Sequence, residues 1–168
     1  MFQYEDEAKK FLYALEKRLG KFDLELESTK TRILPFGRFE GTKDNFDFLG
    51  FTFYNGTTAR GKYRPVIKTS NKKLKQKRQD AKKWLHKNMH NPIAIVGEKL
   101  KAKVLGHYIY YGINGNYVEL KVFYKYIKRT WFKILRKRGQ KRKIKYKDFE
   151  RIWNWLDIPK PKIYVNIW

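Results

Sequence analysis

The chain contains no cysteine, which excludes disulfide bridges and metal sites built from thiolates. It has no apolar run approaching the ~18 residues that a membrane-spanning helix needs, and its first residues carry no signal-peptide pattern. These absences predict a soluble protein, and the lack of cysteine favours a cytoplasmic location. A chain of 168 residues is nevertheless long enough to bury a hydrophobic core without covalent cross-links.

Acidic residues are scarce, and their distribution is uneven. The chain has 16 Asp and Glu against 40 Lys and Arg, a net charge of +24. Residues 1–50 hold 9 basic and 10 acidic residues, whereas residues 51–168 hold 31 and 6. Self-repulsion of this size is tolerated when the usual partner is a polyanion, and the many aromatic residues suit base stacking. We predict a nucleic-acid partner. A merely solvated basic face and a face for anionic lipid are the alternatives.

The first part of the chain has the pattern of a mixed α/β structure. Residues 5–19 repeat apolar side chains at helical spacing, and Gly20 follows them. Asn55-Gly56 is a turn signal that should end an aromatic-rich strand, and Pro65 favours an edge position for the strand around it. Extended pieces or strands are expected at residues 22–26, 32–36, 46–53 and 63–67.

The second part predicts helices. Ser70 or Asn71 can cap a first helix that runs to about Lys87, and Asn91-Pro92 is typical of the start of the next. The remaining helices are expected at residues 118–138 and 146–156, with apolar residues three or four apart on one buried face of each. Prolines then favour an extended tail. The whole pattern predicts an α+β fold in which a small antiparallel β/α part precedes a bundle of three to four helices.

The stretch from Leu105 to Tyr117 joins two of these helices. It carries four tyrosines and a histidine, with Gly112 and Gly115 near its end to supply a turn. We interpret it as an aromatic hinge of a helical hairpin. Helical spacing lets only some of its tyrosines point inward, so core packing and RNA contact both remain open for them.

Two groups resemble metal sites but have simpler explanations. His86 and His90 are four residues apart, yet no Glu lies between them and no third ligand follows. Glu5-Asp6-Glu7 fits the first turn of a helix, where the backbone dipole favours negative charge. We therefore predict no metal ligands and no resident cofactor in this chain.

Several motifs lie in an informative order. Residues 2–39, which include Lys30-Thr31, precede the run Phe48-Leu49-Gly50-Phe51, and Gly106 is spaced from Tyr110-Tyr111 as in an Arg-Gly-x-x-x-Tyr-Tyr signature. Together they resemble the C-terminal part of a bacterial group II intron reverse transcriptase, also called an intron-encoded maturase. Leu105 stands where that signature more often has arginine, so no contact of the arginine carries over.

The resemblance implies a domain organisation. Residues 1–69 would be the C-terminal part of the polymerase palm, residues 70–156 the helical thumb or maturase (X) domain, and residues 157–168 an extended tail. Phe48, Leu49 and Gly50 would resemble the primer grip. Lys30 would lie near the phosphates of the incoming nucleotide, where the family lysine can donate a proton to pyrophosphate.

The resemblance also implies what is missing. In the family, two adjacent aspartates of the Tyr-x-Asp-Asp hairpin and a third aspartate hold the catalytic metal ions, and no Asp-Asp pair occurs in this sequence. We therefore expect no catalytic residue here and no polymerisation by the chain alone. Mg²⁺ would be needed only if a partner chain supplied the fingers and the catalytic palm. Without the aspartates, Lys30 is expected to contact phosphate or to be structural.

The basic residues of the second part are the candidate RNA contacts. Lysines surround the helix after Ser70 so densely that phosphate contact explains them better than solvation, and such a helix can lie along a duplex backbone or an A-form minor groove. The residues expected to bind RNA are Lys72, Lys73, Lys75, Lys77, Arg78, Lys82, Lys83, Lys99, Lys101, Lys103, Tyr108, Tyr111, Lys128, Arg129, Arg136, Arg138, Lys141 and Arg142.

Three functions follow as hypotheses. The first is an RNA-binding thumb that binds structured intron RNA and template–primer, and so assists RNA splicing and reverse transcription. The second is one subunit of a split RNA-directed DNA polymerase, active only with a second chain that carries the catalytic aspartates. The third is a structural RNA-binding subunit of another ribonucleoprotein.

Overall fold

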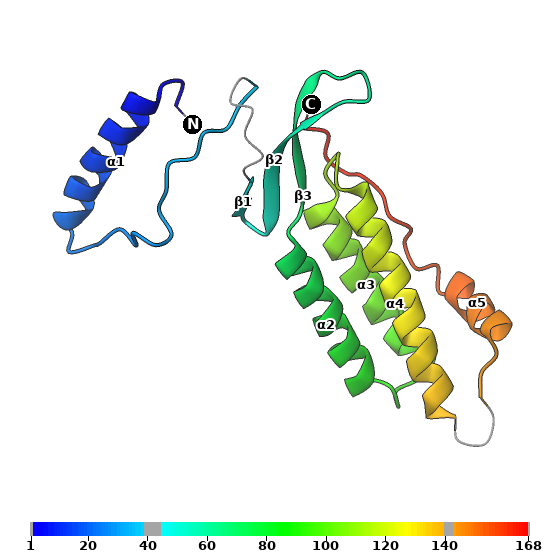
Figure 1. The fold of residues 1–168 in the computed structure, drawn as a ribbon. Coiled ribbons are helices and arrows are strands. Elements are labelled where there is room, and N and C mark those ends of the chain that lie inside the picture. Colours follow the sequence, from blue (N-terminus) through cyan, green and yellow to red (C-terminus); the bar gives the residue numbers. More distant parts are fainter. Residues whose placement is uncertain (1, 39–44, 140–142, 168) are drawn as a thin grey trace. The chain divides into compact units, whose positions relative to one another are not determined.

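The computed structural model of the protein describes residues 2–38, 45–139 and 143–167. It confirms the α+β prediction, with a three-stranded antiparallel sheet and a mainly helical second part (Figure 1). The strands lie in the order β1-β2-β3. Their bounds are Asn45–Phe48 for β1, Phe51–Thr57 for β2 and Tyr63–Thr69 for β3. The helices are α1 Glu5–Gly20, α2 Asn71–Lys87, α3 Ile93–Tyr111, α4 Tyr117–Arg138 and α5 Tyr146–Trp155.

The chain divides into two compact units that are each discontinuous in sequence. Unit 1 comprises Met1–Asn45 and Tyr54–Pro65, and unit 2 comprises Phe46–Phe53 and Val66–Trp168. Unit 2 therefore contains the β1–β2 turn and all the helices from α2 onward. The domain limits expected at residues 69/70 and 156/157 stay predictions.

Helix α1 of unit 1 forms where the apolar spacing predicted it. Glu5, Asp6 and Glu7 lie in its first turn, while Lys17 and Arg18 lie in its last, as the helix dipole favours. None of its residues is buried. The extended pieces expected at residues 22–26 and 32–36 form no strand in the described structure. Between them, the backbone amides of Lys30 and Thr31 donate hydrogen bonds to the Glu27 carbonyl in a local turn.

The predicted single strand at residues 46–53 is wrong. The chain instead turns at Leu49–Gly50, where φ is +49° and +83°, the sign pattern of a two-residue hairpin turn. Asn55 and Gly56 lie inside β2, and the Asn55 side chain accepts a hydrogen bond of 2.9 Å from the Tyr63 hydroxyl on β3. The edge position predicted for β3 is confirmed.

The helices of unit 2 share one core. Ser70 caps α2 by accepting a hydrogen bond from the Lys73 backbone, and both α2 and α3 pack against α4. Proline 92 is the N-cap of α3 rather than its first helical residue. The apolar faces predicted from sequence are buried here. The core comprises Leu74, Leu85, Val96, Leu100, Val104, Tyr108, Tyr111, Leu120, Phe123, Ile127, Trp131, Ile134, Leu135, Phe149, Trp153, Leu156 and Ile158.

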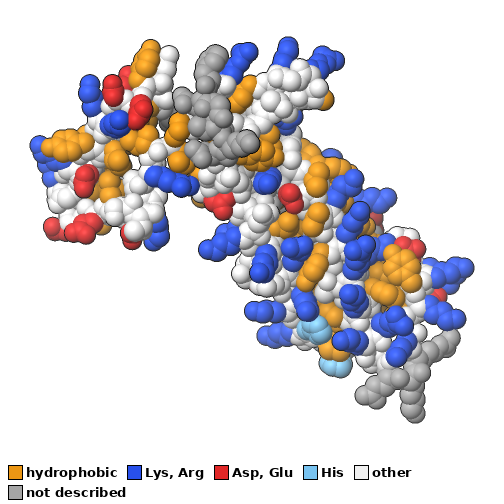
Figure 2. Space-filling model, in the orientation of Figure 1, with side chains coloured by type: hydrophobic (Ala, Val, Ile, Leu, Met, Phe, Trp, Pro, Cys, Tyr) orange, Lys and Arg blue, Asp and Glu red, His pale blue; other side chains and the backbone are white. Residues whose placement is uncertain are grey.

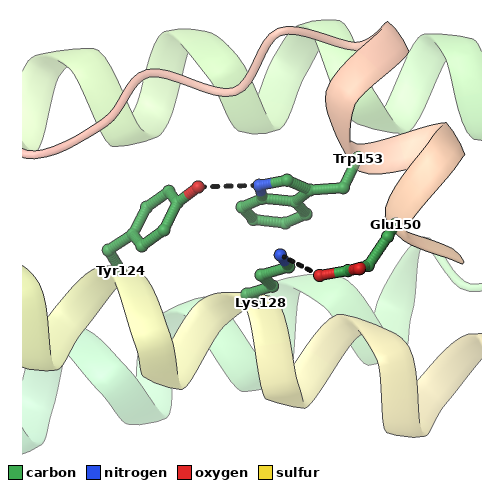
Figure 3. Close-up of polar contacts among 4 residues, drawn as sticks. All are labelled: Tyr124, Lys128, Glu150 and Trp153. Atoms are coloured by element: carbon green, nitrogen blue, oxygen red, sulfur yellow. Dashed lines mark hydrogen bonds and ion pairs between the residues drawn. The ribbon is translucent and has the colours of Figure 1, made fainter. Parts of the chain in front are cut away.

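Helix α5 is fixed to α4 by polar contacts beside its aromatic face (Figure 3). The Trp153 indole donates a hydrogen bond of 2.8 Å to the Tyr124 hydroxyl. Lys128 Nζ lies 3.0 Å from Glu150 Oε1. Burial lowers the pKa of Lys128, but the hydrogen bond to Glu150 and nearby charges outweigh it, so the net pKa is raised. The same hydrogen bond lowers the pKa of Glu150.

The tail runs back to the turn between α3 and α4. The backbone of Tyr164 and Val165 donates to the Gly112 carbonyl at 2.7 and 3.0 Å. A Cβ on Gly112 would lie 3.0 Å from the Lys162 carbonyl oxygen and would overlap the Tyr108 carbonyl. Gly112 has a negative φ of −80°, so glycine is needed there because the backbone of the tail and of Tyr108 lies close to it and leaves no room for a side chain. Gly115 supplies the positive φ of the turn.

Among the described helices, none combines the length and the apolar composition that crossing a membrane requires.

Candidate nucleic-acid interface

The surface of α2 is strongly basic. The helix has eight Lys and Arg residues and one acidic residue, and all seven of its lysines are exposed. Within the described residues, no ion pair engages these lysines. Figure 2 shows Lys and Arg side chains spread over the helical part of unit 2, with hydrophobic side chains between them. The α2 surface is thus available for phosphate.

Other predicted RNA-binding cations have partners within the protein. Lys101 lies 3.5 Å from Asp157, and Lys128 is half-buried against Glu150. Arg138 donates a 3.1 Å hydrogen bond to the Asn91 carbonyl, and Arg78 lies 5.4 Å from the centroid of the Tyr126 ring. Among the other predicted cations outside α2, Lys99, Lys103, Arg129 and Arg136 have exposed side chains. Lys141 and Arg142 lie outside the described residues.

The hinge tyrosines fall into two groups. Tyr108 is fully buried and Tyr111 is 4% exposed, whereas Tyr110 and Tyr117 are 54% and 43% exposed. Burial raises the pKa of both Tyr108 and Tyr111. The RNA contacts expected of Tyr108 and Tyr111 stay predictions. In this structure the Tyr108 side chain is fully buried and exposes no surface to a partner.

Asn116 holds the end of β3 to the α3–α4 turn, a role that the sequence did not indicate. Its side chain is fully buried, and its Oδ1 accepts a 2.7 Å hydrogen bond from the Thr69 backbone. Its Nδ2 donates to the Thr69 hydroxyl and to the Tyr111 carbonyl at 2.8 and 2.7 Å. These contacts fix the sheet end against the helices.

The residues that resemble a primer grip form the β1–β2 turn. Leu49 is 68% exposed, and its carbonyl accepts a 2.9 Å hydrogen bond from the Tyr110 hydroxyl of α3. The Gly50 carbonyl accepts a bond from the Ser70 backbone at 2.9 Å. Phe48 is also exposed. The turn is therefore held against the start of α2 and the end of α3.

A pocket of about 860 Å³ opens between this turn and helices α2, α3 and α4. It is lined by Leu49, Gly50, Lys73, Lys77, Asp80, Ala81, Trp84, Lys103, Gly106, His107, Tyr110, Tyr111 and Phe123. Lys73, Lys77, Lys103 and Tyr111 belong to the residues predicted to bind RNA, and Leu49 and Gly50 belong to the predicted primer grip. Trp84, Gly106 and His107 were not predicted as site residues. Gly106 and His107 belong to the hinge stretch, but they meet Trp84 only when the helices pack.

The remaining candidates are not among the described lining residues of this pocket. Lys30 belongs to unit 1, where its Nζ lies 3.8 Å from Glu27 on an exposed turn. His86 is exposed near the end of α2, and His90 is exposed just beyond it. Across residues 2–38, 45–139 and 143–167, no group of three or more His, Asp and Glu side chains is placed to hold a metal ion.

Comparisons of this chain with protein-family models, with curated proteins and with solved structures find no match. The functional interpretation therefore rests on the charge and geometry described above.

Proposed function

We propose that this protein is the RNA-binding thumb or maturase portion of a group II intron-type reverse transcriptase. In this role it binds structured intron RNA and template–primer, and so assists splicing and reverse transcription. The observation that carries the proposal is the exposed lysine surface of α2, whose cations have no carboxylate partner in the described structure. The fold supports it, because a rigid helical bundle presents these lysines together.

Several lysines along one helix suit a phosphate backbone better than a single anion. Lys72, Lys75, Lys82 and Lys83 have exposed side chains spread over about three helical turns of α2, so they can contact several phosphates along a backbone. Such contacts neutralise phosphates without reading base identity, which fits recognition of structured RNA by its shape.

The test is a charge reversal on α2. Lys72, Lys73, Lys75 and Lys77 are changed together to Glu, and binding to a structured RNA is measured by fluorescence anisotropy at low salt. We expect affinity to fall by about 100-fold or more, because several phosphate contacts become repulsive. Circular dichroism should stay helical, since all four side chains are exposed.

A matched control reverses Lys10, Lys17, Arg18 and Lys21 of unit 1, which changes the net charge by the same amount. This control should retain most of the affinity. Equal losses in the two variants would show that only total charge matters, and the α2 surface would then not be the RNA site.

A further inference from the structure

The pocket between the β1–β2 turn and helices α2, α3 and α4 has the size of a ligand site. Its volume of about 860 Å³ lies within the range of pockets that hold small molecules. All of its lining residues belong to unit 2. At Gly106 the wall is open, because a Cβ there would meet no atom within 4 Å.

The charges that line the pocket favour an anion. Lys73 and Lys77 come from α2, and Lys103 comes from α3. Among the described lining residues Asp80 is the only carboxylate, and it accepts a 2.8 Å hydrogen bond from Gln76. A phosphate near the three ammonium groups would therefore be stabilised.

The rings that line the pocket favour a flat, apolar group beside that anion. Lys103 Nζ lies 5.2 Å from the centroid of the Trp84 ring, so cation and ring adjoin. Tyr110 also lines the pocket, half-exposed and held by its hydrogen bond to Leu49. Aromatic faces of this kind stack on nucleobases without regard to base identity.

His107 supplies polar groups that the protein leaves unused. The residue is 8% exposed and lines the pocket, with its ring stacked on Phe123 at 3.7 Å between centroids. Neither ring nitrogen has a hydrogen-bond partner in the described structure. Burial, with the charge of Lys77, lowers the pKa of His107 to about 4, so at neutral pH the ring offers one donor and one acceptor. Buried polar groups are seldom left unpaired without a ligand or water to satisfy them.

We propose that this pocket binds one unstacked nucleotide, with its base against Trp84 and Tyr110 and its phosphate against Lys73, Lys77 and Lys103. The inference rests on the proposed RNA-binding function and extends it, because the α2 surface alone would bind any phosphate backbone. A flipped-out or single-stranded nucleotide enters the pocket, whereas a paired one cannot.

Occlusion of the pocket tests this directly. Gly106→Leu places a side chain in the open space beside His107, while Ala102→Leu adds the same side chain to an exposed position of α3 outside the lining. Each protein is titrated with a single-stranded oligoribonucleotide, a blunt RNA duplex and adenosine monophosphate. Quenching of tryptophan fluorescence reports binding at Trp84, and Trp84→Phe removes that signal while the other four tryptophans remain.

We expect Gly106→Leu to weaken single-strand binding by about 10-fold or more, because one stacked base is lost. Duplex binding should change by no more than about twofold. Ala102→Leu should bind like the unmodified protein. Equal effects of Gly106→Leu on single strand and duplex, or none on either, would overturn the nucleotide pocket.

The result separates this inference from the proposed function. If the protein binds the duplex and Gly106→Leu does not weaken binding of the single strand, the nucleotide pocket is refuted. The proposed RNA-binding function would still stand. A different outcome is that the protein binds neither the single strand nor the duplex, yet adenosine monophosphate quenches its fluorescence and Gly106→Leu abolishes this quenching. That outcome would refute the RNA-binding thumb and identify a site for a free nucleotide. Quenching by both the oligoribonucleotide and the monophosphate, each lost in Gly106→Leu, supports the inference as stated.

Discussion

His107 links burial to the pH dependence of stability. Its pKa is lowered to about 4 from 6.5, so between these values the unfolded chain binds a proton that the folded protein does not. The contribution of neutral His107 to the free energy of unfolding is therefore fully present above pH 6.5, and it falls as the pH drops toward 4. This residue accounts for a loss of about 3 kcal/mol over that window.

His107→Phe should remove this slope. Phenylalanine keeps the stacking on Phe123 and has no unpaired nitrogens, so we expect the free energy of unfolding at pH 7 to rise by about 1 kcal/mol. Urea unfolding at several pH values measures both effects. Carboxylates titrate equally in the two proteins, so parallel curves for variant and parent would contradict the buried, neutral state of His107.

Two glycines of α3 should respond in opposite directions to the same substitution. A Cβ on Gly97 would overlap the buried side chain of Leu156, whereas one on Gly106 meets nothing. We expect Gly97→Ala to lower the free energy of unfolding by about 1–3 kcal/mol through overpacking. Gly106→Ala should raise it by about 0.5–1 kcal/mol, because alanine favours the helix. Thermal unfolding measures both, and a neutral Gly97→Ala would show that α5 is free to shift.

At the scale of elements, unit 2 depends on the joint between β3 and the α3–α4 turn. Asn116→Ala would remove three hydrogen bonds and leave the Thr69 amide and the Tyr111 carbonyl buried without this partner. We expect a loss of about 2–4 kcal/mol, measured by urea unfolding. Asn154→Ala, at an exposed position of α5, is the matched control and should change stability by less than about 0.5 kcal/mol. A similar small effect at Asn116 would mean that the joint is not structural.

At the scale of the whole molecule, the separation of charge governs binding. Residues 51–168 carry 31 basic and 6 acidic residues, so RNA affinity should come mainly from released counterions. With about 6–10 phosphate contacts, we expect affinity to fall by about 10³–10⁵ between roughly 50 and 200 mM salt. Anisotropy titrations at several salt concentrations measure the slope. A flat profile would contradict a phosphate-dominated interface.

The sequence by itself determined the helices and the charge of this protein. Apolar residues at three- and four-residue spacing fixed the buried faces of α3, α4 and α5, because helical periodicity is local and one turn repeats the next. The cap at Ser70 likewise depends on neighbours three residues apart. The lysine surface of α2 was also evident from sequence, since charges on so basic a helix cannot all be buried.

Only the tertiary structure decided the hairpin and the pocket. The hydrogen bond from Tyr110 to Leu49 spans 61 residues, and that from Asn116 to Thr69 spans 47. Neither contact leaves a local pattern. The aromatic, β-prone run at residues 46–53 by itself predicts a continuous strand across the turn at Leu49–Gly50. Helical spacing leaves the hinge tyrosines undecided between core and surface, and only the packed structure buries Tyr108 and leaves Tyr110 half-exposed. The neighbours of His107 come from three helices, which is why its lowered pKa and unpaired nitrogens follow from the fold and not from its place in the sequence.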